Sequence, residues 1–266
     1  MDIEELPSVC VLDASTYVGY WILKGLLSRG YTVHAAIQKN NGETEIVKKI
    51  REMEREEERL AVFEVDALDY HSILIALKGC SAMFCCLDST DGYDDNMVDW
   101  EIRGAINDVD ERSWSDQEFC RKLKLWYALA KTLSEQAAWA LAMDRMLSMV
   151  SINAGLVLGP GVSQQNPSST ISYLKGAAQM YENGVLASVD VNFLADVHIR
   201  AFQDRSTCGR YFCFNQTVNT EDEAVKLAQS LNPLVSLLPG YENQGNEVHA
   251  ERLRTKKLNK LVEGTA

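Results

Sequence analysis

The chain has 266 residues, of which 46% are apolar and 24% are charged. These values suit one large α/β domain or two small ones and exclude the disordered and fibrous classes of protein. The 38 acidic and 26 basic residues give a formal net charge of −12, which disfavours binding to nucleic acid or to an anionic membrane surface.

The sequence has no run of 18 apolar residues, and its acidic N-terminus lacks the pattern of a secretory leader. The seven cysteines are odd in number, include no CxxC pair and are mostly flanked by apolar residues. No two of the four histidines have the spacing of metal ligands. We therefore expect a cytoplasmic protein with buried free thiols and no metal site.

The first 87 residues alternate short apolar runs with longer segments of helical periodicity. The predicted strands are 8–12, 31–37, 60–65 and 81–87. The predicted helices are 17–29, 43–59 and 72–77. In the second helix, acidic and basic residues four apart predict a solvated, ion-paired face. Because the strands are apolar throughout, this βαβαβαβ order predicts a parallel, doubly wound sheet.

After residue 87 the alternation stops. Segments 95–107 and 118–143 are both predicted as helices, with the polar turn region 108–116 between them, and the next strand is predicted at 146–153. A βα unit of about 30 residues is expected here instead.

The C-terminal part is more mixed. It predicts a helix at 169–183, strands at 186–191 and 210–214, and a helix at 221–231. The basic stretch 252–260 predicts a solvated helix face, with an anion-binding patch as the alternative.

A strand, a turn and a helix at the N-terminus form the place where dinucleotide-binding domains hold a diphosphate. Of the three glycines usual in that turn, only Gly19 is present. A carboxylate from Asp13 at about 4 Å from a phosphate would cost about 4 kcal/mol at an effective dielectric constant of 20. Asp13 could instead cap the backbone N–H groups of the helix without any ligand, and both interpretations stay open.

The end of the second predicted strand lacks the acidic residue that NAD sites place against the ribose hydroxyls. Lys39 lies there and could bind a 2′-phosphate, which favours NADP over NAD. An exposed lysine without a ligand is the alternative.

Tyr127 and Lys131 are four residues apart on a predicted helix, so their side chains share a face. An ammonium beside a phenol lowers the phenol pKa. Such a tyrosine can donate a proton to a carbonyl oxygen as hydride arrives. Tyr20 and Lys24 have the same spacing in the first helix, where we interpret them as structural.

Short stretches of the chain match the motifs of one protein family, in the same order, over nearly the whole length. They are 19–24, 29–33, 110–120, 126–131, 134–139, 156–160, 189–191, His198 and 209–211. In these stretches the chain resembles the cinnamoyl-CoA reductase-like and dihydroflavonol reductase-like branch of the extended short-chain dehydrogenases/reductases. The resemblance implies a Rossmann-like α/β domain over 8–160. It also implies a smaller mixed α/β substrate-binding part over 161–266, which includes a return strand to the main sheet.

The resemblance further implies NADP(H)-dependent reduction of a carbonyl or thioester of a small hydrophobic, phenylpropanoid-like compound, with NAD the less favoured cofactor. Tyr127 is the implied acid, and Lys131 orients the ribose and Tyr127. The implied cofactor-binding residues are Asp13, Ser15, Thr16, Tyr17, Val18, Gln38, Lys39, Asp66, Leu87, Lys131 and Ala154. The implied partner is a small-molecule substrate.

The chain departs from the family pattern at several positions. The family has glycines at Asp13 and Thr16 and a basic residue at Gln38. Three further departures surround the tyrosine and argue against a CoA-thioester substrate: Leu125, Leu129 and Ala130. A family proline is replaced by Ala154.

The largest departure lies between Asn107 and Asp108. There the family has a helix end, a fifth parallel strand and a loop with the catalytic Ser or Thr, and no residue of this chain matches that loop. We predict that the chain is shortened and lacks one central strand. The two strands on either side of the gap must then pair with each other or leave unpaired edges inside the sheet. Such a protein is expected to be marginally stable or prone to aggregation. A catalytically inactive Rossmann-fold binding protein, and an NAD(P)-using epimerase or dehydratase, are the alternatives.

Overall fold

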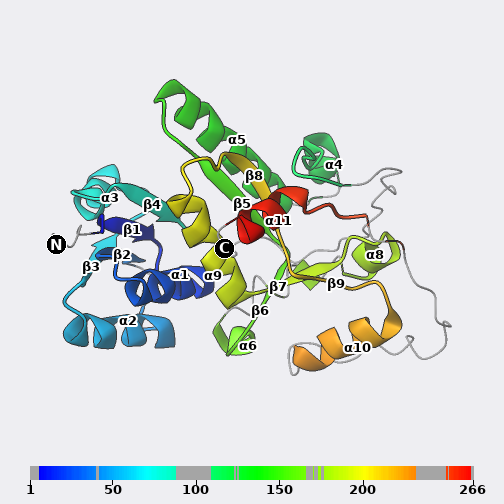
Figure 1. The fold of residues 1–266 in the computed structure, drawn as a ribbon, viewed down its shortest axis with the longest axis horizontal. Coiled ribbons are helices and arrows are strands. Elements are labelled where there is room, and N and C mark those ends of the chain that lie inside the picture. The colour runs from blue at the N-terminus through cyan, green and yellow to red at the C-terminus, as the bar shows by residue number, and fades with distance from the viewer. Residues whose placement is uncertain are drawn as a thin grey trace. The chain divides into compact units, whose positions relative to one another are not determined.

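The computed structural model divides the chain into two compact units. The first unit is Met1–Ser89 with Val191–Arg205, and the second is Thr90–Asp190 with Ser206–Ala266 (Figure 1). The predicted division into 8–160 and 161–266 differs from this one and stays a prediction. The residues that the structure describes are 6–39, 42–87, 109–122, 124, 126–165, 170, 173–174, 177–231, 250 and 252–264.

The first unit is built on a four-stranded parallel sheet in the order β3-β2-β1-β4. Its strands are β1 (Val9–Leu12), β2 (Val33–Gln38), β3 (Leu60–Val65) and β4 (Ala82–Cys85). Leu12, the last residue of β1, lies opposite Ala36 on one neighbour and Cys85 on the other. The predicted parallel sheet is therefore confirmed. Its strands end at one edge, because all four run in the same direction.

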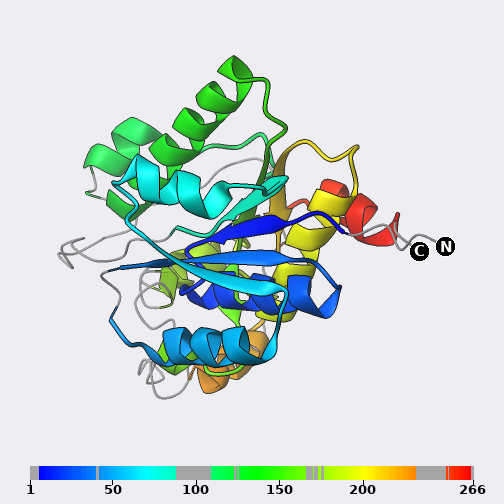
Figure 2. The same ribbon diagram turned by 90° about the vertical axis from the view of Figure 1, so that its left-hand side faces the viewer.

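Helices cover both faces of this sheet. They are α1 (Tyr17–Ser28), α2 (Glu45–Glu56), α3 (Tyr70–Leu77) and α9 (Val191–Gln203). Apolar side chains of α1, α2 and α9 share one core with alternate residues of the strands, and α3 packs in a second core on the opposite face. Figure 2 shows the sheet between α3 on one side and α1 and α2 on the other. The sheet is doubly wound, as predicted, although the sequence pattern did not predict α9.

The described residues of the second unit form two small sheets. One pairs β5 (Val150–Ala154) with β8 (Gly209–Cys213) in parallel. The other contains β6 (Leu156–Leu158), β7 (Ala187–Asp190) and β9 (Gln216–Thr217), with β9 antiparallel to β7. Its helices are α4 (Gln117–Lys122), α5 (Trp126–Asp144), α6 (Val162–Gln165), α8 (Ala177–Glu182), α10 (Glu221–Ser230) and α11 (Lys256–Glu263).

Two predicted elements of this unit are wrong in part. The single helix predicted at 118–143 is interrupted, because Lys124 has a φ of 56° and this left-handed backbone ends α4 before α5 begins. The strand predicted from Met146 begins only at Val150, since Met146 itself has a φ of 52° in the turn that follows α5.

The basic stretch predicted as one helix face is also divided. Leu253 bridges Val109 in extended conformation, and α11 begins only at Lys256. The ammonium of Lys257 donates to the carbonyl oxygens of Cys208 and Arg210. This lysine therefore has a structural role in holding α11 to β8.

The predicted helix 95–107 and the 107/108 junction lie outside the described residues. In the described ranges, β4 pairs with β1 alone and β5 pairs with β8 alone. Each is thus an edge strand of its own sheet.

The structure describes all seven cysteines, and none forms a disulfide. Burial raises the pKa of the Cys10 and Cys213 thiols to about 12. Cys85 and Cys208 are exposed, so the prediction of buried thiols is wrong for these two. Within the described residues there is neither a helix long and apolar enough to cross a membrane nor a cluster of three metal-ligating side chains.

The start of α1 lies unusually close to the end of β1, and Gly19 makes this approach possible. A Cβ atom at residue 19 would overlap the carbonyl oxygen of Asp13 and would lie 2.8 Å from Thr16 Oγ1. Gly25, further along α1, faces the Cδ1 atom of Ile199 at 2.8 Å and Arg29 Nη1 at 3.4 Å. The closest contact at Gly19 is with backbone, whereas the contacts at Gly25 are with the ends of side chains.

We therefore expect Gly19→Ala to destabilise the protein by about 2 kcal/mol, because the added methyl group pushes α1 away from β1. Gly25→Ala is the matched control and should be nearly neutral, since a small shift of Ile199 is offset by the better helix propensity of alanine. Urea unfolding of both variants measures the difference. Equal destabilisation by the two substitutions would contradict this account of Gly19.

Candidate functional site

The predicted cofactor-binding residues of the first unit lie at the carboxyl ends of its strands. The turn from Asp13 to Thr16 follows β1 and leads into α1. Gln38 ends β2, Asp66 follows β3, and Leu87 lies just beyond β4. In a parallel sheet these ends share one edge, which is where open α/β sheets bind their ligands.

The turn between β1 and α1 is held by hydrogen bonds among its own residues. The Ser15 hydroxyl donates to Asp13 Oδ1 at 2.6 Å, and the Thr16 hydroxyl donates to the Asp13 carbonyl oxygen at 3.0 Å. Thr16 Oγ1 accepts from the backbone N–H of Gly19 at 3.1 Å and is the N-cap of α1. The N-cap of α1 is therefore Thr16 and not Asp13, whose carboxylate and carbonyl oxygens help to hold the turn.

Backbone geometry explains how this turn forms with a single glycine. Asp13 has a φ of 64°, in the left-handed region where the family has glycine and where aspartate is tolerated better than most residues. Thr16 has a φ of −72° and needs no glycine. The turn therefore forms without the two glycines that the family has at these positions. The buried carboxylate of Asp13, 3% exposed, is the feature that opposes a diphosphate at this turn.

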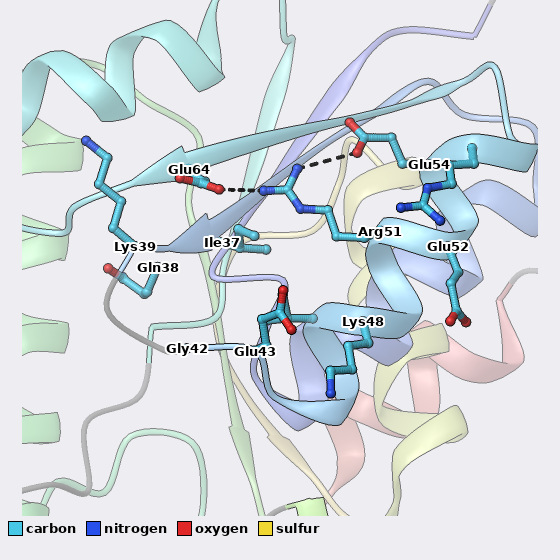
Figure 3. Close-up of a pocket in the computed structure, with 12 residues that line it drawn as sticks. Ile37, Gln38, Lys39, Gly42, Glu43, Lys48, Arg51, Glu52, Glu54 and Glu64 are labelled. Carbon is cyan, nitrogen blue, oxygen red and sulfur yellow. Dashed lines mark hydrogen bonds and ion pairs between the residues drawn. The ribbon is translucent and has the colours of Figure 1, made fainter.

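A hollow of about 580 Å³ lies beside the end of β2 and along α2 (Figure 3). Its basic lining residues are Lys39, Lys48, Arg51 and Arg55. Its acidic lining residues are Glu43, Glu52, Glu54 and Glu64. Of the lining residues, the sequence predicted Gln38 and Lys39 as cofactor-binding and α2 as a solvated face. The spacing of Lys48, Arg51 and Arg55 along one side of α2 was the available signal.

The cations of this hollow differ in their partners. Arg51 contacts Glu64 at 2.6 Å and Glu54 at 3.4 Å, so its charge is compensated. In the described part of the chain, neither Lys39 nor Lys48 forms an ion pair. Figure 3 shows these two lysine side chains extending in different directions from the two sides of the hollow.

Gln38 and Asp66 both shape the loop after β3. Gln38 Oε1 accepts from the backbone N–H of Ala67 at 3.3 Å, and Asp66 Oδ1 accepts from that of Leu68 at 2.9 Å. Gln38 thus connects the end of β2 to this loop. Gln38 stands where the family has a basic residue, so the cation at the end of β2 is Lys39 instead.

The predicted catalytic residues lie in the second unit. Tyr127 and Lys131 are on one face of α5, and the Lys131 Nζ lies 5.4 Å from the centre of the Tyr127 ring. Ala154, the remaining predicted cofactor residue, is the exposed last residue of β5. The similarly spaced Lys24 lies closer to Trp21, at 4.5 Å from its ring, than to Tyr20, which agrees with a structural role.

A network of side chains that the sequence did not predict lies one turn after Lys131. Glu135 on α5 forms an ion pair with Arg210 on β8, and the guanidinium stacks on Trp114. The three residues belong to quoted motifs but had no assigned role. They are far apart in the sequence, so no local spacing could connect them.

Comparison with known proteins identifies the family, although no protein-family profile matches the chain. The chain is 32% identical over 241 residues to cinnamoyl-CoA reductase 2 of Medicago truncatula, covering 77% of this chain and 71% of that protein. It is 26% identical over 299 aligned positions to the bifunctional dihydroflavonol 4-reductase/flavanone 4-reductase of Malus domestica, covering 97% and 85% of the two chains.

Solved structures show the same fold. Vestitone reductase from alfalfa (Medicago sativa) superposes with a TM-score of 0.68 at 22% identity, covering 96% of this chain and 92% of that one. Gre2 from Candida albicans in complex with NADPH gives a TM-score of 0.61 at 16% identity, covering 97% and 94%. With the parallel sheet and the α5 pair, these comparisons show that the chain belongs to the cinnamoyl-CoA reductase and dihydroflavonol reductase family of extended short-chain dehydrogenases/reductases.

Proposed function

We propose that this protein is an NADP(H)-dependent oxidoreductase that reduces a carbonyl group of a small hydrophobic, phenylpropanoid-like compound. The observation that carries the proposal is the Lys131 ammonium 5.4 Å from the Tyr127 ring on α5, in a chain 32% identical to a cinnamoyl-CoA reductase. The acidic surface charge and the cysteines without disulfides support a cytoplasmic enzyme with a small-molecule substrate and no nucleic-acid partner.

In this proposal Tyr127 is the acid. When bound, the nicotinamide cofactor supplies the hydride. Tyr127 donates its phenolic proton to the carbonyl oxygen of the substrate, which becomes an alcohol. Lys131 stabilises the tyrosinate that remains, because an ammonium close to a phenol favours its ionised form.

We propose that the first unit supplies most of the cofactor contacts. The turn Asp13, Ser15, Thr16 and the start of α1 at Tyr17 and Val18 would hold the diphosphate. Gln38, Asp66 and Leu87 lie at neighbouring strand ends. Lys131 and Ala154 stay predicted cofactor residues.

Lys39, which forms no ion pair among the described residues, would meet the 2′-phosphate. The NADPH bound to the structurally similar Gre2 of Candida albicans supports NADPH as the cofactor.

The departures near the tyrosine favour a carbonyl compound over a CoA thioester. Leu129 stands where the family signature has a tyrosine, and it is only 7% exposed. It packs with Cys120 and Phe119 of α4. Its side chain therefore contributes to the core between α4 and α5 instead of binding a substrate.

Replacement of the acid tests the proposed reaction. Tyr127→Phe should lower the rate of NADPH-dependent carbonyl reduction by at least about 100-fold, because no proton reaches the forming alkoxide. Tyr20→Phe is the matched control, with the same spacing to a lysine, and should keep the wild-type rate. The assay follows NADPH absorbance with a dihydroflavonol, a hydroxycinnamaldehyde and cinnamoyl-CoA. An undiminished rate in Tyr127→Phe would refute the assigned role.

Replacement of Lys39 tests the cofactor preference. Lys39→Gln should weaken NADPH binding by about tenfold, a loss of about 1.4 kcal/mol, and leave NADH binding unchanged, because only NADPH carries the 2′-phosphate. Lys49→Gln removes an exposed lysine that pairs with Glu45 on α2 and does not line the hollow, so it should change neither affinity. Fluorescence titration with both nucleotides gives the dissociation constants. Parallel losses for NADPH and NADH would argue against a 2′-phosphate contact.

A catalytically inactive Rossmann-fold protein is the second candidate, and the length of the chain favours it. The alignment with the Malus domestica enzyme spans 299 positions, whereas the chain has 266 residues. At least 33 positions of that alignment therefore have no residue here. In this proposal the gap lies at the 107/108 junction, where no residue matches the Ser or Thr loop, and β4 has no second partner strand among the described residues.

Restoring this unit distinguishes the candidates. If the chain is an inactive short form, insertion of the corresponding βα segment of a relative at 107/108 should introduce NADPH-dependent turnover that the original chain lacks. The inserted strand should also raise the thermal midpoint, because it satisfies the exposed strand edges. A sharp, cooperative unfolding transition of the original monomer above about 55 °C, together with turnover equal to that of the restored form, would exclude the second candidate.

A further inference from the structure

Three side chains with proton chemistry follow one another along α5. Tyr127, Lys131 and Glu135 are spaced four residues apart, so they share one face of the helix. The ammonium of Lys131 therefore has two attractive neighbours on its own helix, a phenol one turn before it and a carboxylate one turn after it. Which of the two it approaches decides whether it can support an ionised Tyr127.

Glu135 is engaged by other groups. Arg210 donates from Nε to Glu135 Oε1 at 2.9 Å and from Nη2 to Oε2 at 3.3 Å, and each side chain of the pair is 13% exposed. Trp139 Nε1 donates to Oε1 at 3.3 Å. Burial raises the pKa of Glu135, but hydrogen bonds from Ser151, Arg210 and Trp139 outweigh it and lower the pKa. The carboxylate is thus ionised and held on both oxygens.

Arg210 is held in place from several directions. It lies on β8 directly opposite Ser151 of β5. Its Nη1 donates to the carbonyl oxygens of Glu111 at 2.9 Å and Ser113 at 2.6 Å. Its guanidinium lies 3.8 Å from the centre of the Trp114 ring. These contacts fix the planar group, so it presents two N–H donors to Glu135 in a constant geometry.

We infer that Arg210 is a positioning residue of the proposed reductase: by occupying both carboxylate oxygens of Glu135, it keeps the Lys131 ammonium beside Tyr127. The inference rests on the proposed function for its catalytic meaning. Arg210 acts through Glu135 and Lys131 and makes no contact with the reacting atoms in this account. Its loop contacts at Glu111 and Ser113 are a separate, purely structural contribution.

If Glu135 and Tyr127 compete for the Lys131 ammonium, loss of Arg210 has an effect that loss of a purely structural residue would not have. Without Arg210, Glu135 is an uncompensated carboxylate one turn from Lys131, and the ammonium should turn toward it. Tyr127 then loses its stabilising charge. Neutralising Glu135 as well removes the competing carboxylate, so a second substitution there should return the Lys131 ammonium to Tyr127.

The experiment compares the full-length wild type with Arg210→Met, Arg210→Met/Glu135→Gln and Glu135→Gln. The pKa of Lys131 is measured by NMR on reductively ¹³C-methylated protein and assigned with Lys131→Arg. Arg210→Met should raise this pKa by about 0.5 unit through the new carboxylate partner. The double variant should return it to the wild-type value, and Glu135→Gln alone should not raise it, because that substitution leaves Arg210 as an uncompensated cation.

A second measurement follows the chemistry. The pH at which NADP⁺-dependent oxidation of the product alcohol reaches half of its maximum rate should rise by about one unit in Arg210→Met, because Tyr127 ionises less readily without a neighbouring ammonium. The double variant should restore the wild-type pH profile.

The outcomes separate the inference from the proposed function. If Lys131 shifts and the double variant reverses the shift, the inference holds, even if no form of the protein turns over substrate and the reductase proposal fails. If the double variant does not reverse the shift, or no shift occurs, Arg210 serves only to hold the loop and the inference is wrong. Should Arg210→Met not fold, Arg210→Lys and Arg210→Lys/Glu135→Gln decide. A single ammonium leaves Glu135 partly open, so a smaller but reversible shift is expected.

Discussion

The close contact between the start of α1 and the end of β1 is the constraint on which the first unit depends. It requires a residue without a side chain at position 19, since any Cβ there meets the Asp13 backbone. It also requires a left-handed residue at the end of β1, which Asp13 provides at φ 64°. The turn therefore forms between β1 and α1 although two of the glycines usual in a dinucleotide-binding loop are absent.

At Asp13 the backbone conformation and the side-chain charge have different consequences, one for the turn and one for nucleotide binding. The left-handed conformation that the turn needs is available to aspartate, so the fold tolerates the substitution. The carboxylate is buried and hydrogen-bonded to Ser15, so its charge stays close to the place where a diphosphate would lie. The side chain of Asp13 therefore opposes an anion at the turn where dinucleotide-binding domains hold a diphosphate.

The second unit is organised around a polar contact. Of the 19 residues of α5, Leu129, Thr132 and Ala142 are the buried ones, so apolar packing alone anchors this helix weakly. The ion pair between Glu135 and Arg210, with 13% exposure on each side, supplies a second anchor to β8. A bidentate contact of this kind fixes direction as well as distance. The helix that carries Tyr127 and Lys131 is thereby oriented by a residue of a strand that lies far from it in the sequence.

Periodicity along the chain was sufficient to predict the four parallel strands, the helices between them and the shared face of Tyr127 and Lys131, because each depends on neighbours within a few residues. Only the three-dimensional structure shows the rest. It has Thr16, and not Asp13, as the N-cap of α1. It also has a left-handed Lys124 that divides a predicted helix, with no glycine or proline beside it to signal the break. The pairing of Glu135 with Arg210 joins residues 75 positions apart, and a contact of that range leaves no periodic trace in the sequence.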